Sequence, residues 1–382
     1  MSSVSFLETD KYKRLRNTVR EFVGTEITWE KSREIDQSDQ YPHDLIKEVG
    51  RLGLLGLNVS PEYGGTGGNV IDVMILYEEV SKRLPVLAWT LGNVTLYGNG
   101  IISVNGSKEQ KEKYLPRLVN GELLFSFSLT EPDAGSDAAN IKTSAVYDHG
   151  SYCINGNKMF ISGASVSDYN IAMTRTDKSR YGGITSFLVD CKDEGYTATP
   201  IKKLGYNGSD TCEVIYDDVR VTPREILGGE EFLNKGWKQM INTLNEERLA
   251  LSACALGIGK AVIDQIISFA VKNYDFNLVS NQTIQHRIVE MATELESARQ
   301  LAYNAAWMEV NNRECVKETS MSKYYSTETA KKIAMESMDL MGEYGALEET
   351  DIQRFFRDVT ILTIGGGTSQ IMKNIIAKTL GL

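Results

Sequence analysis

The chain has 382 residues, of which 42% are hydrophobic and 24% are charged, and this composition fits a globular protein with a large core or several packed subdomains. Its formal net charge of -10 disfavours a nucleic-acid-binding protein and a partner at an anionic membrane surface, because both require a basic face. The N-terminus is polar and no run of about 18 apolar residues is present, so we expect neither a signal peptide nor membrane insertion.

The cysteines and histidines bear on the redox compartment and on metal binding. The five cysteines are scattered, with no CxxC pair, and the three histidines show no ligand spacing. This distribution predicts reduced thiols in a cytoplasmic protein, and it disfavours a zinc site or another metal site.

Residues 1–121 are predicted to form a helical domain. Apolar residues recur there at three- and four-residue spacing, which is the pattern of a core-facing helix stripe: Leu45, Val49, Leu52 and Leu55. The glycine-rich segment 61–68 interrupts the helices as a flexible loop. It lacks the Gly-Lys-Ser/Thr ending of a phosphate loop, and the helices on either side leave no preceding strand for a dinucleotide fold.

Residues 122–233 are predicted to form a small antiparallel β domain. Short runs rich in β-branched and aromatic residues indicate five strands: 125–129, 151–154, 170–173, 185–189 and 213–216. Glycine-containing pairs are predicted to be turns: Asn155-Gly156, Gly182-Gly183 and Asn207-Gly208.

Residues 234–382 are predicted to form a C-terminal four-helix bundle. All seven prolines precede residue 224, and an interior proline would cost a helix roughly 3 kcal/mol, so this stretch favours long helices. The expected helices are 246–269, 285–312, 320–342 and 370–380. The fold class is therefore α+β, mostly α, and it differs from a Rossmann or TIM arrangement because strands and helices do not alternate.

The β segment carries the most specific motif of the chain. Residues 129–137 read Leu-Thr-Glu-Pro-Asp-Ala-Gly-Ser-Asp, which resembles the Thr-Glu-Pro-x-Ala-Gly-Ser-Asp signature of acyl-CoA dehydrogenases. Further matches follow in family order: Asn-Gly-Asn-Lys-Met-Phe-Ile-Ser at 155–162, Lys-Leu-Gly at 203–205, Ser-Asp-Thr at 209–211, Asp-Asp-Val-Arg-Val at 217–221, and Glu247-Arg248. Because these matches run through almost the whole chain, it is identified as a member of this family.

The resemblance implies an architecture, a cofactor and partners. The family has an N-terminal helical domain, a central β domain and a C-terminal four-helix bundle, which is the order that the residues predict independently. It implies FAD as the cofactor and an acyl thioester as the substrate, carried either by CoA or by a carrier protein. It also implies an electron acceptor such as electron-transfer flavoprotein, and assembly as a homodimer or homotetramer.

Nine residues match family positions that contact the cofactor: Phe127, Leu129, Thr130, Ser136, Phe160, Ser162, Gln282, Thr368 and Gln370. The hydroxyls of Thr130 and Ser136 can bond polar atoms of the flavin or the substrate, and Ser136 is also a substrate-binding candidate. The Phe160 ring matches the aromatic group that packs against the isoalloxazine. The alternatives are that the hydroxyls cap turns and that Phe127 belongs to the core. The turn 365–367 precedes a helix, whose free N–H groups can bind an anion.

The expected catalytic base is missing from its usual place. Residues 363–370, Thr-Ile-Gly-Gly-Gly-Thr-Ser-Gln, resemble the family segment Tyr-Glu-Gly-Thr-Ser-Gln, with Gly366 in place of the glutamate. In the isovaleryl and long-chain branches the base stands just before an arginine on a bundle helix, and Glu247 occupies that position ahead of Arg248. The resemblance implies that Glu247 is the base and that Arg248 binds substrate. The alternatives are that Glu246 and Glu247 form the solvated first turn of a helix, and that Arg248 forms a structural ion pair.

Three further departures from the family pattern lie at the flavin edge. The family segment Arg-x-x-Phe-Gly becomes Val-Lys-Asn-Tyr-Asp at 271–275, so that the arginine that reaches the FAD pyrophosphate of a neighbouring subunit is Val271. A glutamine near the adenine end becomes Asp339. One cation is lost, and two anions, Asp275 and Glu343, are gained. These changes predict weaker FAD binding, unless the adjacent lysine takes over the role of the arginine.

Several functions stay open on the sequence. The favoured one is an oxidoreductase that couples α-proton abstraction from an acyl thioester to hydride transfer to flavin. The crotonobetainyl-CoA reductase branch, which runs in reverse, also has glycine at the usual base position. A relative that oxidises a carrier-tethered amino- or hydroxyacyl group in polyketide or nonribosomal biosynthesis is the second candidate. A non-catalytic family member and a flavin monooxygenase on the same fold are the others, and Glu247 disfavours a desulfinase-like relative.

Overall fold

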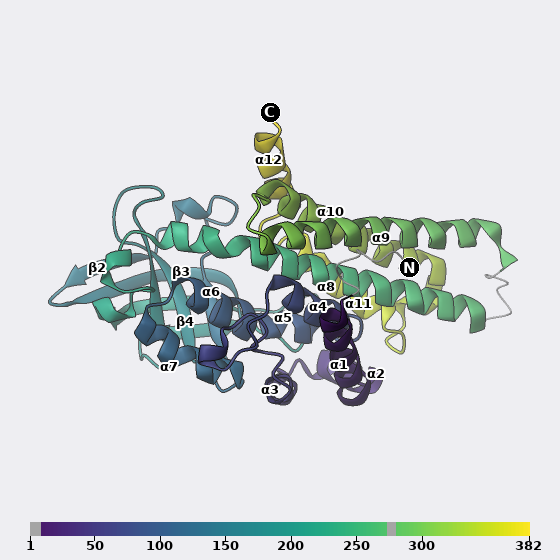
Figure 1. Cartoon of the computed structure of the whole chain (residues 1–382), viewed down its shortest axis with the longest axis horizontal. Helices are drawn as coiled ribbons and strands as arrows, with labels where there is room; N and C mark the ends of the chain where they lie inside the picture. The colour runs from purple at the N-terminus through teal and green to yellow at the C-terminus, as the bar shows by residue number, and fades with distance from the viewer. Residues whose placement is uncertain (1–8, 273–279) are drawn as a thin grey trace.

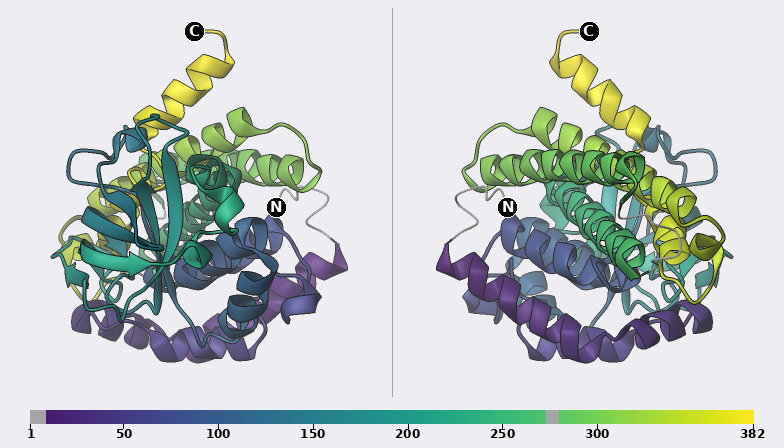
Figure 2. Two further views of the ribbon diagram at one scale, coloured as in Figure 1. Left: turned by 90° about the vertical axis from the view of Figure 1, so that its left-hand side faces the viewer. Right: turned by 90° about the vertical axis from the view of Figure 1, so that its right-hand side faces the viewer.

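The structure is a computed structural model that describes residues 9–272 and 280–382. Helices, a β sheet and further helices follow one another along the chain, and the sheet lies at one end of the longest axis (Figure 1). Figure 2 views the molecule along that axis. The N-terminal helices lie on one side of the long C-terminal helices, and the last helix leaves the body on the opposite side.

The N-terminal part is helical, with one π-helical turn: α1 (Asp10–Glu26), α2 (Trp29–Ser38), α3 (His43–Arg51), α4 (Val70–Ser81), α5 (Pro85–Val94), η3 (Thr95–Gly100), α6 (Ile101–Asn105) and α7 (Lys108–Val119). All residues of α4 are buried, and it begins with a capping box in which Asn69 and Asp72 each accept a backbone N–H. The prediction that Leu52 belongs to the core-facing apolar stripe is wrong, because this residue follows the end of α3 and is 37% exposed. The other three members of the stripe are buried.

The central part is a curled seven-stranded sheet of β1 (Phe125–Ser128), β2 (Ser144–Asp148), β3 (Ser151–Ser162), β4 (Tyr169–Arg175), β5 (Ile184–Asp190), β6 (Tyr196–Pro200) and β7 (Thr211–Val221). The strand order is β1-β4-β2-β3-β7-β6, and β5 pairs with β4. Most pairings are antiparallel, as predicted. The exceptions are β1 and β2, which both join β4 in parallel.

Two details of the sheet differ from the sequence-based prediction. Strands β2 and β6 were not expected, and Asn155-Gly156 lies inside β3 instead of forming a turn. The β3–β7 register shifts at this point, which is a β-bulge. A Cβ on Gly156 would lie 2.6 Å from the Cα of Thr143, so the glycine serves a close approach of two backbones inside the sheet.

The C-terminal part comprises α8 (Gly236–Lys272), α9 (Gln282–Val310), α10 (Val316–Met341), α11 (Ile352–Leu362) and α12 (Ser369–Thr379). Short 3-10 turns also occur in the described residues: η2 (Pro61–Tyr63), η4 (Ala138–Asn140), η5 (Pro223–Glu225), η6 (Glu230–Phe232) and η9 (Gly342–Ala346). One continuous hydrophobic core joins this bundle to the N-terminal helices, and α4 packs directly against α8.

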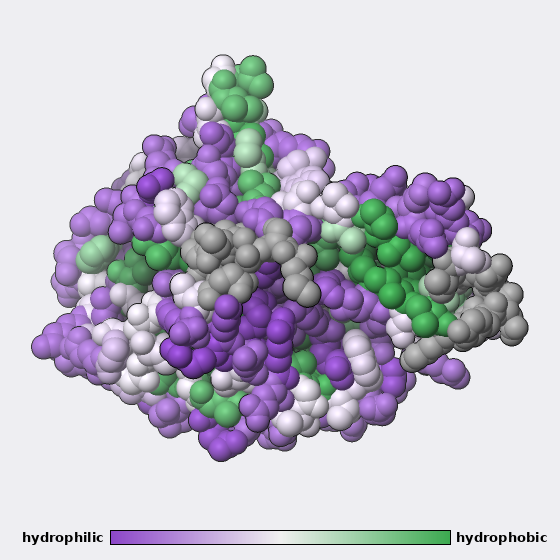
Figure 3. Space-filling view, turned by 45° about the vertical axis from the view of Figure 1, so that its right-hand side comes forward, coloured by the Kyte–Doolittle hydropathy of each residue, from purple (hydrophilic) through white to green (hydrophobic). Residues whose placement is uncertain are grey.

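The bundle has four helices, but its fourth member is not the one predicted. Helix α11, which the sequence did not indicate, packs against α10 and α8. The expected fourth helix, 370–380, corresponds to α12, which contacts α10 and then projects from the body (Figure 1). The space-filling view shows hydrophobic residues on this projecting helix above a largely hydrophilic face (Figure 3). Leu380, near its end, is 59% exposed.

Helix α8 begins ten residues earlier than predicted, beside the β sheet, and runs along the body. Residues 236–271 have the length and hydropathy of a membrane-spanning helix. The most hydrophobic part of this stretch is 61% buried inside the protein, which is also the behaviour of a core helix. The early start places Glu246 and Glu247 about three turns into the helix, so the expectation that they form its first turn is wrong.

Candidate active site

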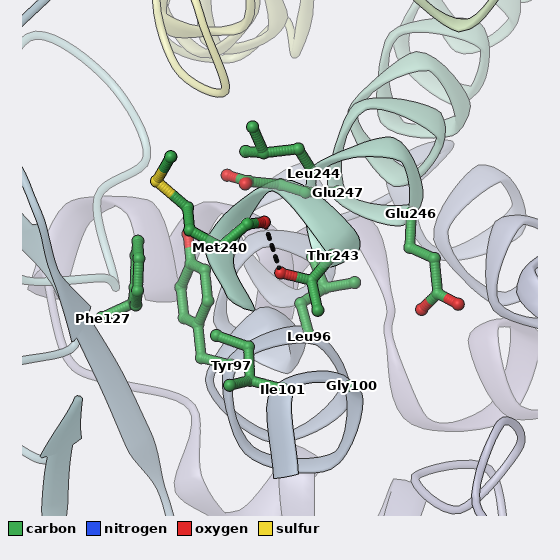
Figure 4. Close-up of a pocket in the computed structure, with 10 residues that line it drawn as sticks. All are labelled: Leu96, Tyr97, Gly100, Ile101, Phe127, Met240, Thr243, Leu244, Glu246 and Glu247. Carbon is green, nitrogen blue, oxygen red and sulfur yellow. Dashed lines mark hydrogen bonds between the residues drawn. The ribbon is translucent and has the colours of Figure 1, made fainter. Parts of the chain in front are cut away.

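A narrow cavity lies where α8 passes η3, α6 and β1. Its lining combines aliphatic, aromatic and acidic side chains: Leu96, Tyr97, Gly100, Ile101, Phe127, Met240, Thr243, Leu244, Glu246 and Glu247. Helix α8 supplies both carboxylates, and Figure 4 shows that they point to different sides of the helix. Two neighbouring glutamates therefore have different surroundings in the same cavity wall.

The two carboxylates differ in the charges around them. Burial raises the pKa of its carboxyl above the ordinary value, and the cations of Arg248 and Lys323 and the hydroxyl of Tyr97 oppose that rise. Burial also raises the pKa of Glu246, and the charge of Glu309 adds to the rise. A carboxylate with a raised pKa is a stronger proton acceptor than an ordinary one, so both groups are suited to proton transfer, and only Glu247 has cations beside it.

The glycine that replaces the expected base faces Glu247. A Cβ on Gly366 would lie 3.7 Å from Oε1 of Glu247 and 2.5 Å from Cδ1 of Leu251. Gly366 has φ +63°, a backbone conformation that favours glycine. The space in front of Gly366 therefore already holds the carboxylate of Glu247 and a leucine side chain, and a larger residue would collide with the leucine.

Arg248 is buried beside the acid, and part of its guanidinium lacks a hydrogen-bond partner among the described residues. It is 7% exposed, and its Nε is buried with no hydrogen-bond partner in the described parts of the chain. Burial lowers the pKa of its guanidinium, and Glu247 opposes this shift. The structure gives Arg248 no ion pair with a carboxylate of residues 9–272 or 280–382, so the alternative of a structural ion pair is not supported.

Two aromatic residues flank the acid. Tyr97 from η3 and Phe127 from β1 stack with ring centroids 5.8 Å apart, and both line the cavity. A π-helical turn such as η3 is uncommon and often occurs at functional sites. Phe127 is partly buried and packs against the hydrophobic core while its ring also lines the cavity, so its position fits both the core alternative and a role in the site.

Phe160 and Ser162 on β3 each have a group that is available to a ligand. Phe160 is 64% exposed at φ +63°, which is a strained conformation for a non-glycine residue. The Oγ of Ser162 accepts the indole N–H of Trp89 at 3.2 Å, which leaves its own O–H to donate. The same Trp89 approaches the glycine turn, since a Cβ on Gly365 would lie 3.3 Å from its ring.

Residues at the start of the 129–137 motif form structural hydrogen bonds with β3. The carbonyl oxygen of Leu129 accepts a hydrogen bond from the buried Lys158 at 3.1 Å, and that of Thr130 accepts the Met159 N–H at 2.9 Å. Lys158 also pairs with Glu131 of the motif at 2.9 Å. Ser136 is exposed in the loop, where its hydroxyl is accessible to a ligand.

Of the nine cofactor candidates, Phe127 alone lines this cavity, and three of the others lie at the starts of two helices. Thr368 caps α12, because its Oγ1 accepts the Ile371 N–H at 3.2 Å, and Gln370 is exposed in the first turn of that helix. Gln282 is exposed at the start of α9, at the end of the bundle away from the sheet (Figure 1). Within one chain, Gln282 is therefore not brought together with Phe160 and Ser162.

The structure describes three of the residues that depart from the family pattern near the expected FAD site: Val271, Asp339 and Glu343. Val271 is 54% exposed, and Asp339 forms an ion pair with Arg287 at 2.7 Å, so this acid is partly neutralised. Glu343 is exposed in η9. Residues 273–275 of the altered segment, including Asp275, lie outside the described residues.

Sequence reasoning missed Trp89, Tyr97 and Lys323, because none of them belongs to a local motif. Phe160 exposes its aromatic ring on β3, Ser162 on the same strand keeps a donor hydroxyl, and Phe127 on β1 lies in the cavity wall. Aromatic faces and polar donors are the groups that a planar, polar-edged cofactor such as a flavin requires.

Comparison with known proteins gives matches along nearly the whole chain. Residues 9–122, 126–219 and 234–381 match the N-terminal, middle and C-terminal domains of acyl-CoA dehydrogenase, respectively. The 3-(aryl)acrylate reductase of Clostridium sporogenes is 36% identical over 97% of this chain and 99% of its own length. Subunit CarC of the caffeyl-CoA reductase-Etf complex of Acetobacterium woodii is 33% identical over 97% and 98%. The crystal structure of the prolyl acyl carrier protein oxidase AnaB superposes with a TM-score of 0.92 at 26% identity, covering 98% of this chain and all of that one.

Proposed function

This chain belongs to the acyl-CoA dehydrogenase family, and from that premise we propose that it is a FAD-dependent oxidoreductase of acyl thioesters that uses Glu247 as its acid/base. The observation that carries the proposal is the position of the Glu247 carboxylate, 3.7 Å from the site of a Cβ on Gly366. A carboxylate from α8 thus stands next to the residue where the family usually carries one.

The chemistry needs such a group because the α-proton of a thioester is only weakly acidic. A positioned general base contributes about 100- to 10,000-fold to the rate of such a proton transfer. Burial raises the pKa of Glu247, which makes its ionised form a better acceptor in oxidation and its protonated form available as a donor in reduction. Met240 and Leu244 contribute apolar side chains to the wall of the same cavity.

The residues that would hold FAD are Phe127, Phe160 and Ser162 on the sheet, with Leu129, Thr130 and Ser136 in the segment after β1 and with Thr368 and Gln370 at the start of α12. The chemistry that FAD supplies when bound is acceptance of a hydride from the β-carbon, or its return in the reductive direction. Gln282 would act on the cofactor of a second copy, because it lies away from the sheet in its own chain. This assignment supports a homodimer or homotetramer.

The direction of the reaction and the electron carrier belong to the same proposal. Two of the relatives are named as reductases, and one of them is part of a complex with Etf. These names support reduction of an enoyl thioester as well as oxidation, with an electron-transfer flavoprotein as the partner. The five free cysteines support a cytoplasmic location.

A second candidate is oxidation of an amino- or hydroxyacyl group tethered to a carrier protein. The likeness to the prolyl acyl carrier protein oxidase and the altered flavin edge favour it. The test is a panel of acyl-CoA and acyl-carrier-protein thioesters mixed anaerobically with the FAD-loaded protein, with flavin bleaching and product analysis as readouts. Bleaching by CoA thioesters supports the first candidate, and bleaching by carrier-protein thioesters alone supports the second.

The same panel addresses the two remaining alternatives. Protein that takes up no FAD on reconstitution would support a non-catalytic family member and contradict the proposal. A long-lived flavin-oxygen adduct on reoxidation would support a monooxygenase, whereas plain reoxidation after thioester-dependent bleaching supports an acyl thioester oxidoreductase.

A further inference from the structure

Lys323 on α10 is a buried lysine to which the proposed reaction assigns no role. It is fully buried, and its Nζ donates a hydrogen bond to the carbonyl oxygen of Gly367 at 2.6 Å. Gly367 follows Gly366, which borders the Glu247 carboxylate. A single ammonium group therefore connects the middle of the bundle with the turn that flanks the proposed acid/base.

The charges that face Lys323 come from three elements. Helix α8 presents Glu247 and Arg248, α10 itself presents Glu328, and the turn before α12 presents the Gly367 carbonyl. Glu328 is in turn the acceptor for the hydroxyl of Ser369 at the start of α12. Burial lowers the pKa of Lys323 to about 8, so the group is largely protonated at neutral pH and remains a cation beside Glu247.

We propose that Lys323 is a positioning residue, whose ammonium holds the glycine turn 365–367 in place and keeps the neighbouring Glu247 ionised. The inference rests on the proposed role of Glu247. Its physical reason has two parts. A nearby cation favours the charged form of a buried carboxylate. The turn has two successive glycines at φ +63° and +95° and no side chains of its own. Backbone hydrogen bonds hold its two borders, from Gly365 N–H to the Ile361 carbonyl at 2.9 Å and from Ser369 N–H to the Thr363 carbonyl at 3.0 Å, and the Lys323 hydrogen bond adds a side-chain contact to Gly367 between them.

The test compares variants of the FAD-loaded enzyme in the pH dependence of flavin reduction by the best acyl-CoA of the thioester panel. Lys323→Met removes both charge and donor, Lys323→Gln keeps a donor without charge, and Lys323→Arg keeps the charge in a different shape. Lys332→Met is the matched control, because Lys332 lies on the same helix, is 54% exposed and pairs with Glu294. Its pH profile should equal that of the wild type.

We expect the two neutral variants to raise the apparent pKa for flavin reduction by about one unit, as loss of a neighbouring cation should. Lys323→Arg should keep the apparent pKa and lower the limiting rate, because the planar guanidinium cannot reproduce the contact of the ammonium. A purely structural lysine would lower stability and FAD content without moving the apparent pKa.

An unchanged apparent pKa in a folded, FAD-containing neutral variant would overturn the inference. If neither neutral variant retains FAD, the arginine variant decides alone, and an apparent pKa raised by about one unit in this charge-keeping variant would overturn the inference. The failure of the proposed function is a separate result. It would appear as wild-type reduction in Glu247→Gln, whereas failure of this inference leaves that variant inactive.

Discussion

Glu247 and Gly366 are far apart in sequence and meet at one point: Oε1 of the glutamate lies 3.7 Å from the Cβ position of the glycine. Gly366 has no side chain and leaves space in front of its backbone, and Glu247 of α8 places its carboxylate beside that space. An acid on a helix in the middle of the protein is held by a rigid element, whereas an acid on the glycine turn would depend on the conformation of a short loop.

Adding a side chain at the glycine should therefore be unfavourable. We expect Gly366→Ala to lower the free energy of unfolding by about 1–3 kcal/mol, because the new Cβ would lie 2.5 Å from Leu251 Cδ1 on a backbone at φ +63°. Urea unfolding measures the change. The matched control is Gly24→Ala in α1, where no atom lies within 4 Å, and a loss of stability there as large as at Gly366 would contradict this explanation.

The pH dependence follows from the raised pKa of Glu247, which is caused by burial. Oxidation needs the ionised carboxylate, so flavin reduction should increase as pH rises through an apparent pKa above the ordinary glutamate value of about 4.3. Reduction of an enoyl thioester needs the protonated acid and should decrease through the same range. Stopped-flow rates in both directions check this pair of profiles, and parallel profiles in the two directions would contradict it.

The same shift has a consequence for stability. At pH values between the unfolded pKa and the raised folded pKa, the folded state keeps a proton on Glu247 that the unfolded state has released, so the contribution of this residue to stability falls as pH rises through that range. Glu247→Gln should therefore increase the free energy of unfolding at neutral pH, with little gain at acidic pH. Urea unfolding of both proteins at the two pH values measures the difference, and an equal effect at both would contradict the burial of the charge.

Phe160 should contribute to cofactor binding through its ring. We expect Phe160→Leu to weaken FAD binding about tenfold, since an aromatic contact is worth about 0.5–1.5 kcal/mol beyond the area that it buries. Reconstitution of the apoprotein with FAD, followed by flavin fluorescence, gives the affinity. Tyr147→Leu is the control, because Tyr147 is an equally exposed aromatic residue on β2, and an equal loss in both variants would contradict the role of Phe160.

The three-part order of the fold could be predicted from the sequence because its signals are compositional and periodic. The start of α8 was missed because residues 236–245 contain glycine, asparagine and β-branched residues with low helix propensity, and packing of residues such as Met240 stabilises them as helix. Helix α11 was missed for a similar reason, since its buried Arg354 and Asp358 hide the usual apolar stripe. The boundaries 1–121, 122–233 and 234–382 stay a prediction.

The sequence predicts those parts of the candidate site that belong to contiguous motifs. The pair Glu247-Arg248, the glycine turn and the β3 segment are contiguous in sequence and have recognisable spacing. Trp89, Tyr97 and Lys323 are single residues on separate helices, and only tertiary packing brings them to the cavity and the turn. A single sequence carries no sign of such long-range contacts.

The most direct measurement is the rate at which the thioester substrate reduces the flavin of Glu247→Gln. This variant keeps the shape of the side chain and removes its basicity, so the rate should fall at least about 100-fold, the lower limit for a lost general base. Glu246→Gln, whose side chain points to another side of α8, should lose much less. Flavin reduction in Glu247→Gln at the wild-type rate would contradict the assignment of Glu247 as the acid/base.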